Sequence, residues 1–358
     1  MNTIQNLAAA IERLPAAARA QIADWKLLHL PGNVPPWTTS GIEVSAGDDV
    51  TWLADGAVIA SEELGLWGGP SFHLWARIRG RVPIFKGTQT THSFRADGTG
   101  VFELATYQGE WGTRDGRLAT PVEAYQTVGG AIDAIVFRWK GAALDGLRAL
   151  RDALPDDPFI AAELARHSAP LPRPAGWDQL WFLGDNEIFT PRRHGTSQGI
   201  SVHTCQDAGI LQKRVDCDLH PETRVSWRWL VSELPSKTAE NSIPTHDYLS
   251  IAFEFENGLD LTYYWSAELP VGTVFTCPLP TWAARETHQV VRSGREGIGT
   301  WQTESRALYE DYRAALGEPP KRIVGVWLIA VSIFKRGEGM AEFSDIAIER
   351  PGSKLAVL

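Results

Sequence analysis

Apolar and polar side chains alternate in three runs of the C-terminal half of the chain. The runs cover residues 225–231, 249–255 and 261–266, with aromatic or branched side chains at every second position. This two-residue period predicts half-buried antiparallel strands. Asn257-Gly258 separates the second and third runs and predicts a hairpin that pairs them. We expect the three runs to form one sheet with a polar second face. That face would carry Arg228, Glu254, Glu256, Asp260 and Tyr264.

The rest of the chain predicts more strands, with helices at three places. Apolar residues recur at steps of three and four over residues 3 to about 29, and again over 142 to about 166 and 301–316, which predicts helices there. Short apolar runs between Gly, Asp and Pro clusters predict a β-sandwich in the first half. The fold class is therefore all-β, with two jelly-roll-like β-sandwich domains, an N-terminal helix and a helical linker. The expected segments are 1–30 (helical), 31–141 (first sandwich), 142–176 (helical and Pro-rich linker) and 177–358 (second sandwich).

Charge and composition exclude several classes of partner. The chain has 43 acidic and 34 basic residues, a net charge of −9, which argues against a nucleic-acid ligand. The N-terminus lacks the pattern of a secretory signal, and no apolar run reaches the length of about 20 residues that a membrane span needs. We therefore expect a cytoplasmic protein. Its N-terminal helix is either a packing helix or a dimer contact, which leaves a homo-oligomer open.

The three cysteines do not predict a cofactor. Cys205, Cys217 and Cys277 are few and unevenly spaced, so they form neither a disulfide framework nor a zinc motif. We expect no metal or other cofactor, with calcium as the one alternative.

The first half resembles the PA-I type galactophilic lectins and related small jelly-roll modules. The residues that carry the resemblance are GDDVTW (47–52), LWGGPSFHLWARIRG (66–80), VPIFKGT (82–88), FRADGTGVFELATYQGEWGTRDG (94–116) and IVFRWKG (135–141). The resemblance implies a jelly roll whose late acidic loop binds calcium and a sugar diol.

The corresponding loop, residues 107–116, departs from that pattern. Glu110 and Asp115 are its calcium candidates, with Thr113 as a third oxygen donor, whereas Arg114 places a positive charge beside any such ion. The alternative is a tight turn between two strands, closed by Asp115-Gly116.

The second half resembles a bacterial family known as domain of unknown function 3047. The carrying stretches are SWRWLVS (226–232), HDYLSIAFEF (246–255), YYWSAELPVGT (263–273), VVRSG (290–294), GTWQTESRALYEDYRAALGEPP (299–320) and IVGVWL (323–328). This resemblance implies a jelly-roll-like sandwich and no established activity. The chain departs from the family at 332–339, where relatives carry an Asp- and Asn-rich stretch.

Candidate catalytic residues lie at the start and middle of the second apolar run. His246 and Tyr248 could transfer a proton near neutral pH, and Glu254 could act as one of a pair of carboxylates facing each other across strands. The alternatives are a surface turn at 245–248 and a solvated sheet face around Glu254. Because neighbouring side chains of a strand point to opposite faces, His246 and Asp247 are not expected to share a pocket.

Five further residues are candidates for binding a substrate. Tyr264 shares the polar sheet face, and Arg306 would suit a carboxylate, with an ion pair between helix and sheet as its alternative. Trp residues serve as platforms for sugar rings or fill cores. The candidates are Asp247, Tyr264, Arg306, Trp229 and, in the first domain, His73.

These observations leave three functions open. One is an acid/base enzyme of the lyase, hydratase or glycosidase type, acting on a small molecule or sugar-like ligand in an aromatic-lined pocket. The second is a carbohydrate-binding protein without catalysis. The third is a cytoplasmic enzyme for a small apolar or aromatic metabolite.

Overall fold

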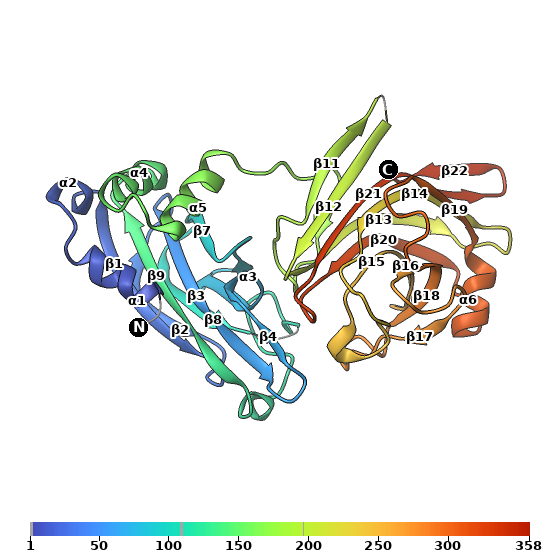
Figure 1. Cartoon of the computed structure of the whole chain (residues 1–358), viewed down its shortest axis with the longest axis horizontal. Coiled ribbons are helices and arrows are strands. Elements are labelled where there is room, and N and C mark those ends of the chain that lie inside the picture. The colour runs from blue at the N-terminus through green and yellow to red at the C-terminus, as the bar shows by residue number, and fades with distance from the viewer. Residues whose placement is uncertain (1–2, 108–109, 196) are drawn as a thin grey trace. The chain divides into compact units, whose positions relative to one another are not determined.

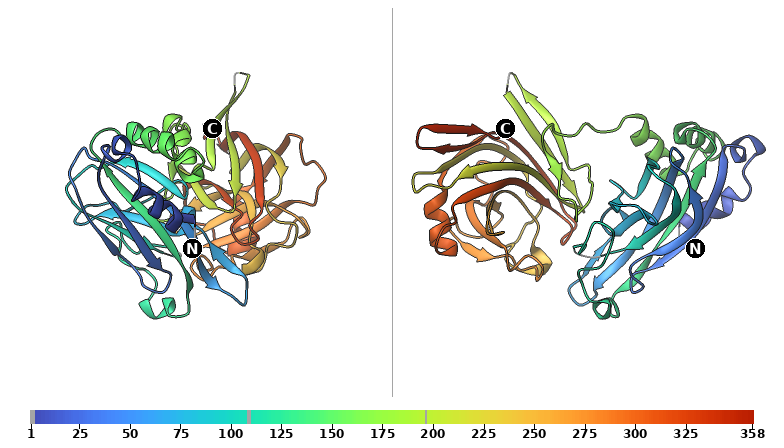
Figure 2. Two further views of the ribbon diagram at one scale, coloured as in Figure 1. Left: turned by 60° about the vertical axis from the view of Figure 1, so that its left-hand side comes forward. Right: turned by 180° about the vertical axis from the view of Figure 1, so that it is seen from behind.

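The computed structural model describes residues 3–107, 110–195 and 197–358 of the chain. Strands predominate throughout (Figures 1 and 2). By internal packing the chain divides into two units. The N-terminal unit comprises Met1–Leu171 with Gly184–Asn186, and the C-terminal unit comprises Pro172–Leu183 with Glu187–Leu358.

The N-terminal unit is a sandwich of two antiparallel sheets. The first sheet contains β1 (Ile22–Pro31), β9 (Gly129–Trp139), β3 (Asp49–Ser61) and β4 (Leu66–Gly68) in that order, with β7 (Thr91–Arg95) also paired to β3. The second contains β2 (Thr38–Val44), β8 (Gly100–Thr106), β5 (Leu74–Ile78) and β6 (Phe85–Lys86). Trp52 of β3 packs between the two sheets, because its ring centroid lies 6.1 Å from those of Phe85 and Phe102, which belong to the second sheet.

Helices cover the outer face of the first sheet (Figure 1). They are α1 (Thr3–Ile11), α2 (Ala16–Arg19), α4 (Ala143–Ala153) and α5 (Pro158–Ser168); α3 (Pro70–His73) and the 3₁₀ turn η1 (Val122–Tyr125) lie elsewhere in the unit. Leu7 of α1 and Leu147 of α4 pack in one cluster with Phe137 of β9. Asp157 begins α5 by accepting a hydrogen bond of 2.9 Å from the Ile160 amide.

The predicted helix over residues 3 to about 29 is wrong beyond Arg19. Residues Ile22–Pro31 form β1, which pairs with β9 along its length. A β-bulge between Ile22 and Asp24 interrupts the two-residue alternation there, so the three-residue spacing of Ile22 and Trp25 imitates a helix.

The C-terminal unit is a second sandwich. Its seven-stranded sheet has the order β10 (Asp178–Gln179), β13 (Ala208–Asp218), β20 (Arg322–Val331), β15 (Tyr248–Phe255), β16 (Asp260–Ser266), β18 (Glu286–Ser293), β17 (Val274–Thr276). The other sheet has the order β11 (Phe189–His194), β12 (Ser197–Cys205), β21 (Glu338–Arg350), β14 (Arg224–Glu233), β19 (Gln302–Ala307), with β22 (Ser353–Ala356) on β21. Helix α6 (Leu308–Leu316) and the 3₁₀ turn η2 (Ile243–Thr245) complete the unit. The predicted all-β class with two sandwiches is thus confirmed.

The three alternating runs do not form one sheet. β15 and β16 pair through the Asn257-Gly258 turn, as predicted, but β14 belongs to the opposite sheet. The rings of Trp227 and Tyr263 stack at 5.4 Å across the core between the sheets. Alternation shows which face of a strand is buried, and strands of two facing sheets bury their apolar faces in the same core. The predicted helix over 301–316 begins only at Leu308, since 302–307 form β19.

The outer face of the seven-stranded sheet is also buried. Residues 267–285, which we call the cover, pack over it together with Leu180 and Phe182. Aromatic and aliphatic side chains form the layer between cover and sheet. They are Tyr248, Ala252, Tyr264, Trp327 and Ile329 from the sheet, and Leu269, Phe275, Cys277, Leu279 and Trp282 from the cover. All seven residues of β16 are buried, so the alternative of a solvated sheet face does not hold for this strand.

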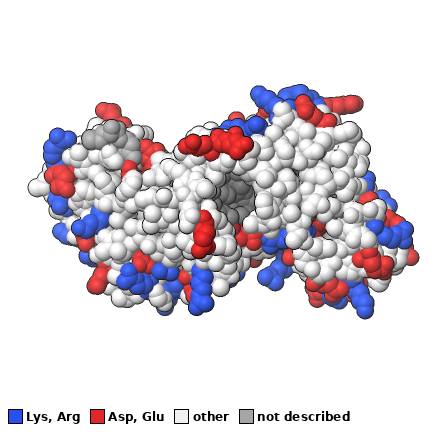
Figure 3. Space-filling view, turned by 90° about the horizontal axis from the view of Figure 1, so that it is seen from below, with Lys and Arg blue, Asp and Glu red and all other residues white. Residues whose placement is uncertain are grey.

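The helices and one face of the surface bear on what a membrane span or a basic patch would require. Within the described ranges, no helix is long and apolar enough to cross a bilayer. On the face shown in Figure 3, Lys and Arg are interspersed with Asp and Glu.

Candidate metal centre

His246 and Asp247 are buried in the C-terminal unit, so the surface-turn alternative does not apply. They point to different partners, as expected of neighbours at a strand start. The Asp247 carboxylate accepts backbone hydrogen bonds of 2.9 Å from Phe334 and 2.6 Å from Lys335, and anchors the chain after β20. The His246 ring lies instead beneath the cover, against the side chains of Tyr248 and His288.

The hydrogen bonding of His246 leaves one ring nitrogen available as a ligand. Its Nδ1 lies 2.7 Å from the carbonyl oxygen of Glu240, which can only accept, so Nδ1 carries the proton and donates. The Nε2 lone pair then faces the Cys277 Sγ at 3.3 Å. A backbone carbonyl holding the second nitrogen is the usual way in which a metal-binding imidazole is oriented.

Glu286 and His288 of β18 complete the group. They are two residues apart on one strand, so both side chains point to the covered face. Glu286 Oε1 lies 3.6 Å from His288 Nε2 and accepts a hydrogen bond of 3.0 Å from the Tyr248 hydroxyl. Neither ring nitrogen of His288 has a hydrogen-bonding partner within the described part of the chain.

One ligand atom from each of His246, Cys277, Glu286 and His288 lies within 4.8 Å of every other. Two ligands of a tetrahedral zinc ion, bound at about 2.0–2.3 Å, are separated by about 3.3–3.6 Å. Two of the six separations, 3.3 Å from nitrogen to sulfur and 3.6 Å from oxygen to nitrogen, agree with this geometry.

Burial makes these side chains unsuited to carrying charge on their own. The four residues are between 0% and 3% exposed. Desolvation lowers the pKa of His246 to about 4 and that of His288 well below its usual value, and it raises the pKa of Glu286 and of Cys277. A divalent ion reverses this preference for the thiol and carboxyl groups. One thiolate, one carboxylate and two neutral imidazoles would give a centre with no net charge.

One feature of the sequence indicates this group, although it belongs to no standard metal-binding motif. Glu286-x-His288 lies in an alternating strand, a spacing that places two ligands on one face. His246 and Cys277 join them only through the hairpin and the cover.

Of the remaining candidates in the C-terminal unit, Tyr264 lies beside the centre and the others do not. Tyr264 lies in the buried layer, its ring 5.6 Å from that of His288. Glu254 is half-buried at the other end of β15. Trp229 fills the core and donates a hydrogen bond of 3.1 Å to Glu304. Arg306 forms a bidentate pair with Asp311, at 2.8 and 2.9 Å, which is the structural alternative considered for it.

In the N-terminal unit, His73 is buried and its Nδ1 lies 2.9 Å from the Tyr107 carbonyl oxygen. Desolvation lowers its pKa to about 4. The calcium candidates lie nearby in sequence, in a loop whose residues 108 and 109 fall outside the described ranges. The Asp115 carboxylate accepts a hydrogen bond from Thr113 and lies 3.6 Å from Arg117. Calcium binding by Glu110 and Asp115 stays a prediction.

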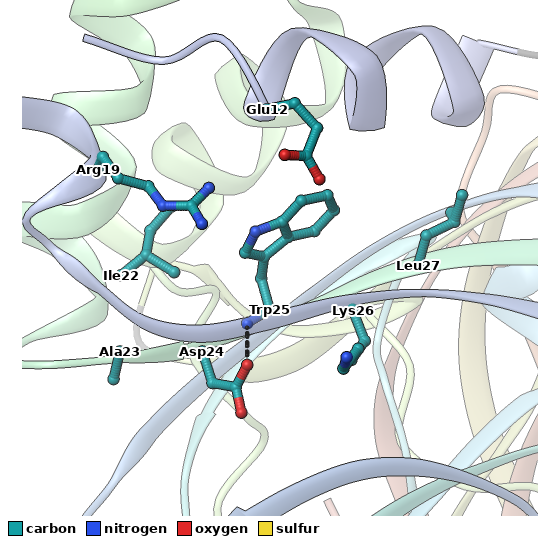
Figure 4. A pocket seen from close by; sticks show the side chains of 8 residues that line it. All are labelled: Glu12, Arg19, Ile22, Ala23, Asp24, Trp25, Lys26 and Leu27. Atoms are coloured by element: carbon teal, nitrogen blue, oxygen red, sulfur yellow. Dashed lines mark hydrogen bonds between the residues drawn. The ribbon is translucent and has the colours of Figure 1, made fainter. Parts of the chain in front are cut away.

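A hollow of about 460 Å³ lies beside β1 in the same unit (Figure 4). Figure 4 shows the Trp25 indole extending from β1 toward Glu12, with Arg19 beside it. None of the candidates from the sequence lines it. The lining residues are Glu12, Arg19 and residues 22–27.

Residues 175–347 match the family described as protein of unknown function (DUF3047). This confirms the resemblance found for the second half of the chain. The DUF3047 match includes every ligand candidate of the centre but carries no activity with it. A search of the curated proteins found no match.

Solved structures give only distant likenesses. A PllA-like lectin, the EclA N-terminal domain, has a TM-score of 0.25 and 16% identity, covering 31% of this chain and 94% of its own. The xyloglucanase domain of NopAA from Sinorhizobium fredii has a TM-score of 0.29 and 10% identity, covering 49% and 93%. The tandem CBM22 domains of Paenibacillus barcinonensis Xyn10C have a TM-score of 0.25 and 10% identity, covering 92% and 98%. The lectin likeness expected for the first half is thus found, at a score too low to support an argument about ligands.

Proposed function

We propose that this protein binds one divalent transition-metal ion of the zinc class in its C-terminal unit. The ligands are His246, Cys277, Glu286 and His288. The observation that carries the proposal is the fully buried His288, which has no hydrogen-bonding partner among the described residues and faces three other ligand atoms within 4.8 Å. Buried polar atoms are normally hydrogen-bonded, so an exception at such a position indicates a missing partner.

The ligand set decides the class of metal. Thiolate and imidazole ligands suit zinc and its neighbours, whereas calcium and magnesium take oxygen ligands. Four protein ligands without exposed surface describe a closed site, which stabilises a fold, rather than the open site of a catalytic zinc. We therefore infer a structural ion.

Metal content after purification and dialysis, measured by inductively coupled plasma mass spectrometry, tests the proposal. We expect one ion per chain, which Co²⁺ can replace with thiolate-to-cobalt absorption in the near ultraviolet. Cys277→Ser should lose the ion and the absorption, whereas Cys205→Ser, which alters an exposed cysteine, should keep both. A wild-type chain that binds neither Zn²⁺ nor Co²⁺ would refute the proposal.

A second function is supported by a row of carboxylates. Glu254, Asp260 and Glu286 stand in register on β15, β16 and β18. Glu254 is the half-buried member, and burial raises its pKa, as suits a general acid. We propose it as the proton-transfer group for a small or sugar-like ligand, because His246 and Tyr248 are too buried to reach one.

Hydrolysis of p-nitrophenyl glycosides by the whole chain tests this second function. Glu254→Gln should abolish turnover, while Glu256→Gln, on the exposed neighbour, should not. Binding of the same glycosides without turnover would favour the non-catalytic carbohydrate-binding alternative. Undiminished turnover in Glu254→Gln would exclude Glu254.

A further inference from the structure

The cover is a long segment with little regular structure of its own. Residues 267–285 contain only the three-residue strand β17, which pairs with β18 at the sheet edge. Val271 and Val274 at its bend are exposed, at 63% and 43%. Segments of this length without secondary structure are uncommon in compact domains and are often functional.

Hydrogen bonds hold the cover in place at its two ends and beside β18. At its start, the Leu269 amide donates a hydrogen bond of 2.8 Å to Ser266 Oγ, and the Ala267 amide donates one of 2.6 Å to Glu240. At its end, the Arg285 and Glu286 amides bond back to the Trp282 carbonyl, and the Arg285 carbonyl accepts a hydrogen bond of 2.9 Å from the Asp260 amide of β16. The middle depends on β17, on backbone hydrogen bonds of 2.9 Å that join Gly272 and Thr273 to Val290, on apolar packing and on Cys277.

Cys277 is the single ligand that the cover supplies to the centre. Its amide donates a hydrogen bond of 3.0 Å to the Glu286 carbonyl, which directs the side chain under the cover. The other three ligands belong to the sheet or to the turn before β15. Without an ion, the thiol lies 3.3 Å from His246 Nε2 and interacts with the Glu286 carboxyl group and the Leu279 backbone, and thiols form only weak hydrogen bonds.

We propose that the ion fastens the cover onto the seven-stranded sheet and that its loss releases the cover while the two sheets stay folded. This inference rests on the proposed metal site. With the ion bound, one coordination bond joins the cover to His246, Glu286 and His288. Without it, the cover keeps the short β17 ladder, its other backbone hydrogen bonds to β16 and β18, and its apolar contacts.

Release of the cover would expose a sheet face that contains both polar and aromatic side chains. Tyr264 Oη and Asp260 Oδ2 are buried there without a hydrogen-bonding partner among the described residues. Uncovering these atoms would let water bond to them, which offsets part of the cost of exposing the rings of Trp282 and Trp327. A polar, aromatic sheet face would then be open to solvent.

Hydrogen–deuterium exchange of the full chain, read by mass spectrometry, tests this inference. The two states are protein saturated with Zn²⁺ and protein stripped with EDTA. We expect amides in 267–285 to exchange at least about tenfold faster in the stripped protein, because local opening needs less free energy. Amides of β13 and β20 should keep their rates in both states.

Variants separate the cover from the centre. Cys277→Ala should give fast exchange in 267–285 with and without Zn²⁺, while Cys205→Ser should respond as the wild type does. If Cys277→Ala does not fold, the comparison of zinc-loaded and stripped wild-type protein still decides the question.

Metal content measured on the same samples distinguishes the two proposals. A chain that takes up no ion refutes the metal site. A chain that binds Zn²⁺ but exchanges equally in both states keeps the site and overturns the fastening of the cover. An equal increase in exchange over the entire C-terminal unit also overturns it, since the ion would then stabilise the whole domain.

Discussion

Each unit of this protein contains a buried group of ionisable side chains, and the two groups differ in their partners. In the N-terminal unit, the Glu103 side chain is only 4% exposed, and it accepts hydrogen bonds of 2.7 Å from Arg77 and 2.5 Å from Arg79. In the C-terminal unit, Glu286 and His288 are equally buried, but the carboxyl group accepts its hydrogen bond from the neutral Tyr248 hydroxyl, and neither ring nitrogen of His288 has a hydrogen-bonding partner among the described residues.

The difference indicates what each group is for. A buried charge with its counter-charge in place is part of the fold and needs no further ligand. Buried ligand atoms that converge without a counter-charge are stable only as neutral groups, or as charged groups around a cation. The predictions below test whether the two groups differ in this way.

The largest expected effect is that of the ion on thermal stability. Zn²⁺ at about a thousandfold excess over its Kd adds about 4 kcal/mol to the free energy of unfolding of a state that binds it. For a domain of this size, that raises the Tm by about 10 °C. Differential scanning calorimetry with Zn²⁺ and with EDTA measures the shift. Glu103→Gln should show the same shift. A wild-type Tm that is unchanged by Zn²⁺ would contradict the proposal that only the C-terminal group binds a cation.

Removing the charge of the partnered group should cost stability. Glu103→Gln leaves Arg77 and Arg79 without their carboxylate, and hydrogen bonds to charged groups contribute about 1.5–3 kcal/mol each in partly buried positions. Because both arginines retain access to water, we expect a loss of about 2 kcal/mol in total. Chemical denaturation by urea measures it. A loss below about 0.5 kcal/mol would show that the pair adds little.

Removing the unpartnered ring should have the opposite sign in metal-free protein. His288→Phe replaces an imidazole that lies 4.9 Å from the Phe275 ring with an apolar ring of similar shape. Since no hydrogen bond is lost, we expect a gain of about 1 kcal/mol. The same variant should lose the response to Zn²⁺. Destabilisation of the metal-free protein would mean that His288 already has a partner.

The smallest effect is the pH dependence of the partnered group. Desolvation raises the pKa of Glu103, but hydrogen bonds and charges from Arg79 and Arg77 outweigh it, and the folded pKa lies below the usual value. The unfolded chain therefore binds the proton first, so stability is present above the unfolded pKa of about 4.3 and falls below it. The difference in unfolding free energy between wild type and Glu103→Gln should shrink as the pH falls from about 5 to about 3. A constant difference over that range would exclude this linkage.

The sequence by itself determined the fold class and much of the second sandwich. Alternation and the Asn257-Gly258 turn predict β15 and β16 with their pairing. The resemblance to DUF3047 was found in the same half of the chain as the family match, residues 175–347. These properties depend on neighbouring residues, whose side chains leave a periodic pattern. The helix predicted over residues 3 to about 29 failed because a bulge imitates the helical spacing after Arg19.

Tertiary structure decided which strands share a sheet and which side chains form the centre. β14 shows the same alternation as β15, but no local pattern states which sheet it joins. His246 and Cys277 reach Glu286 and His288 only because the cover folds back over the sheet, which also buries the outer face of the sheet. Contacts between distant segments depend on packing that leaves no periodic trace in the sequence, so only the folded chain reveals them.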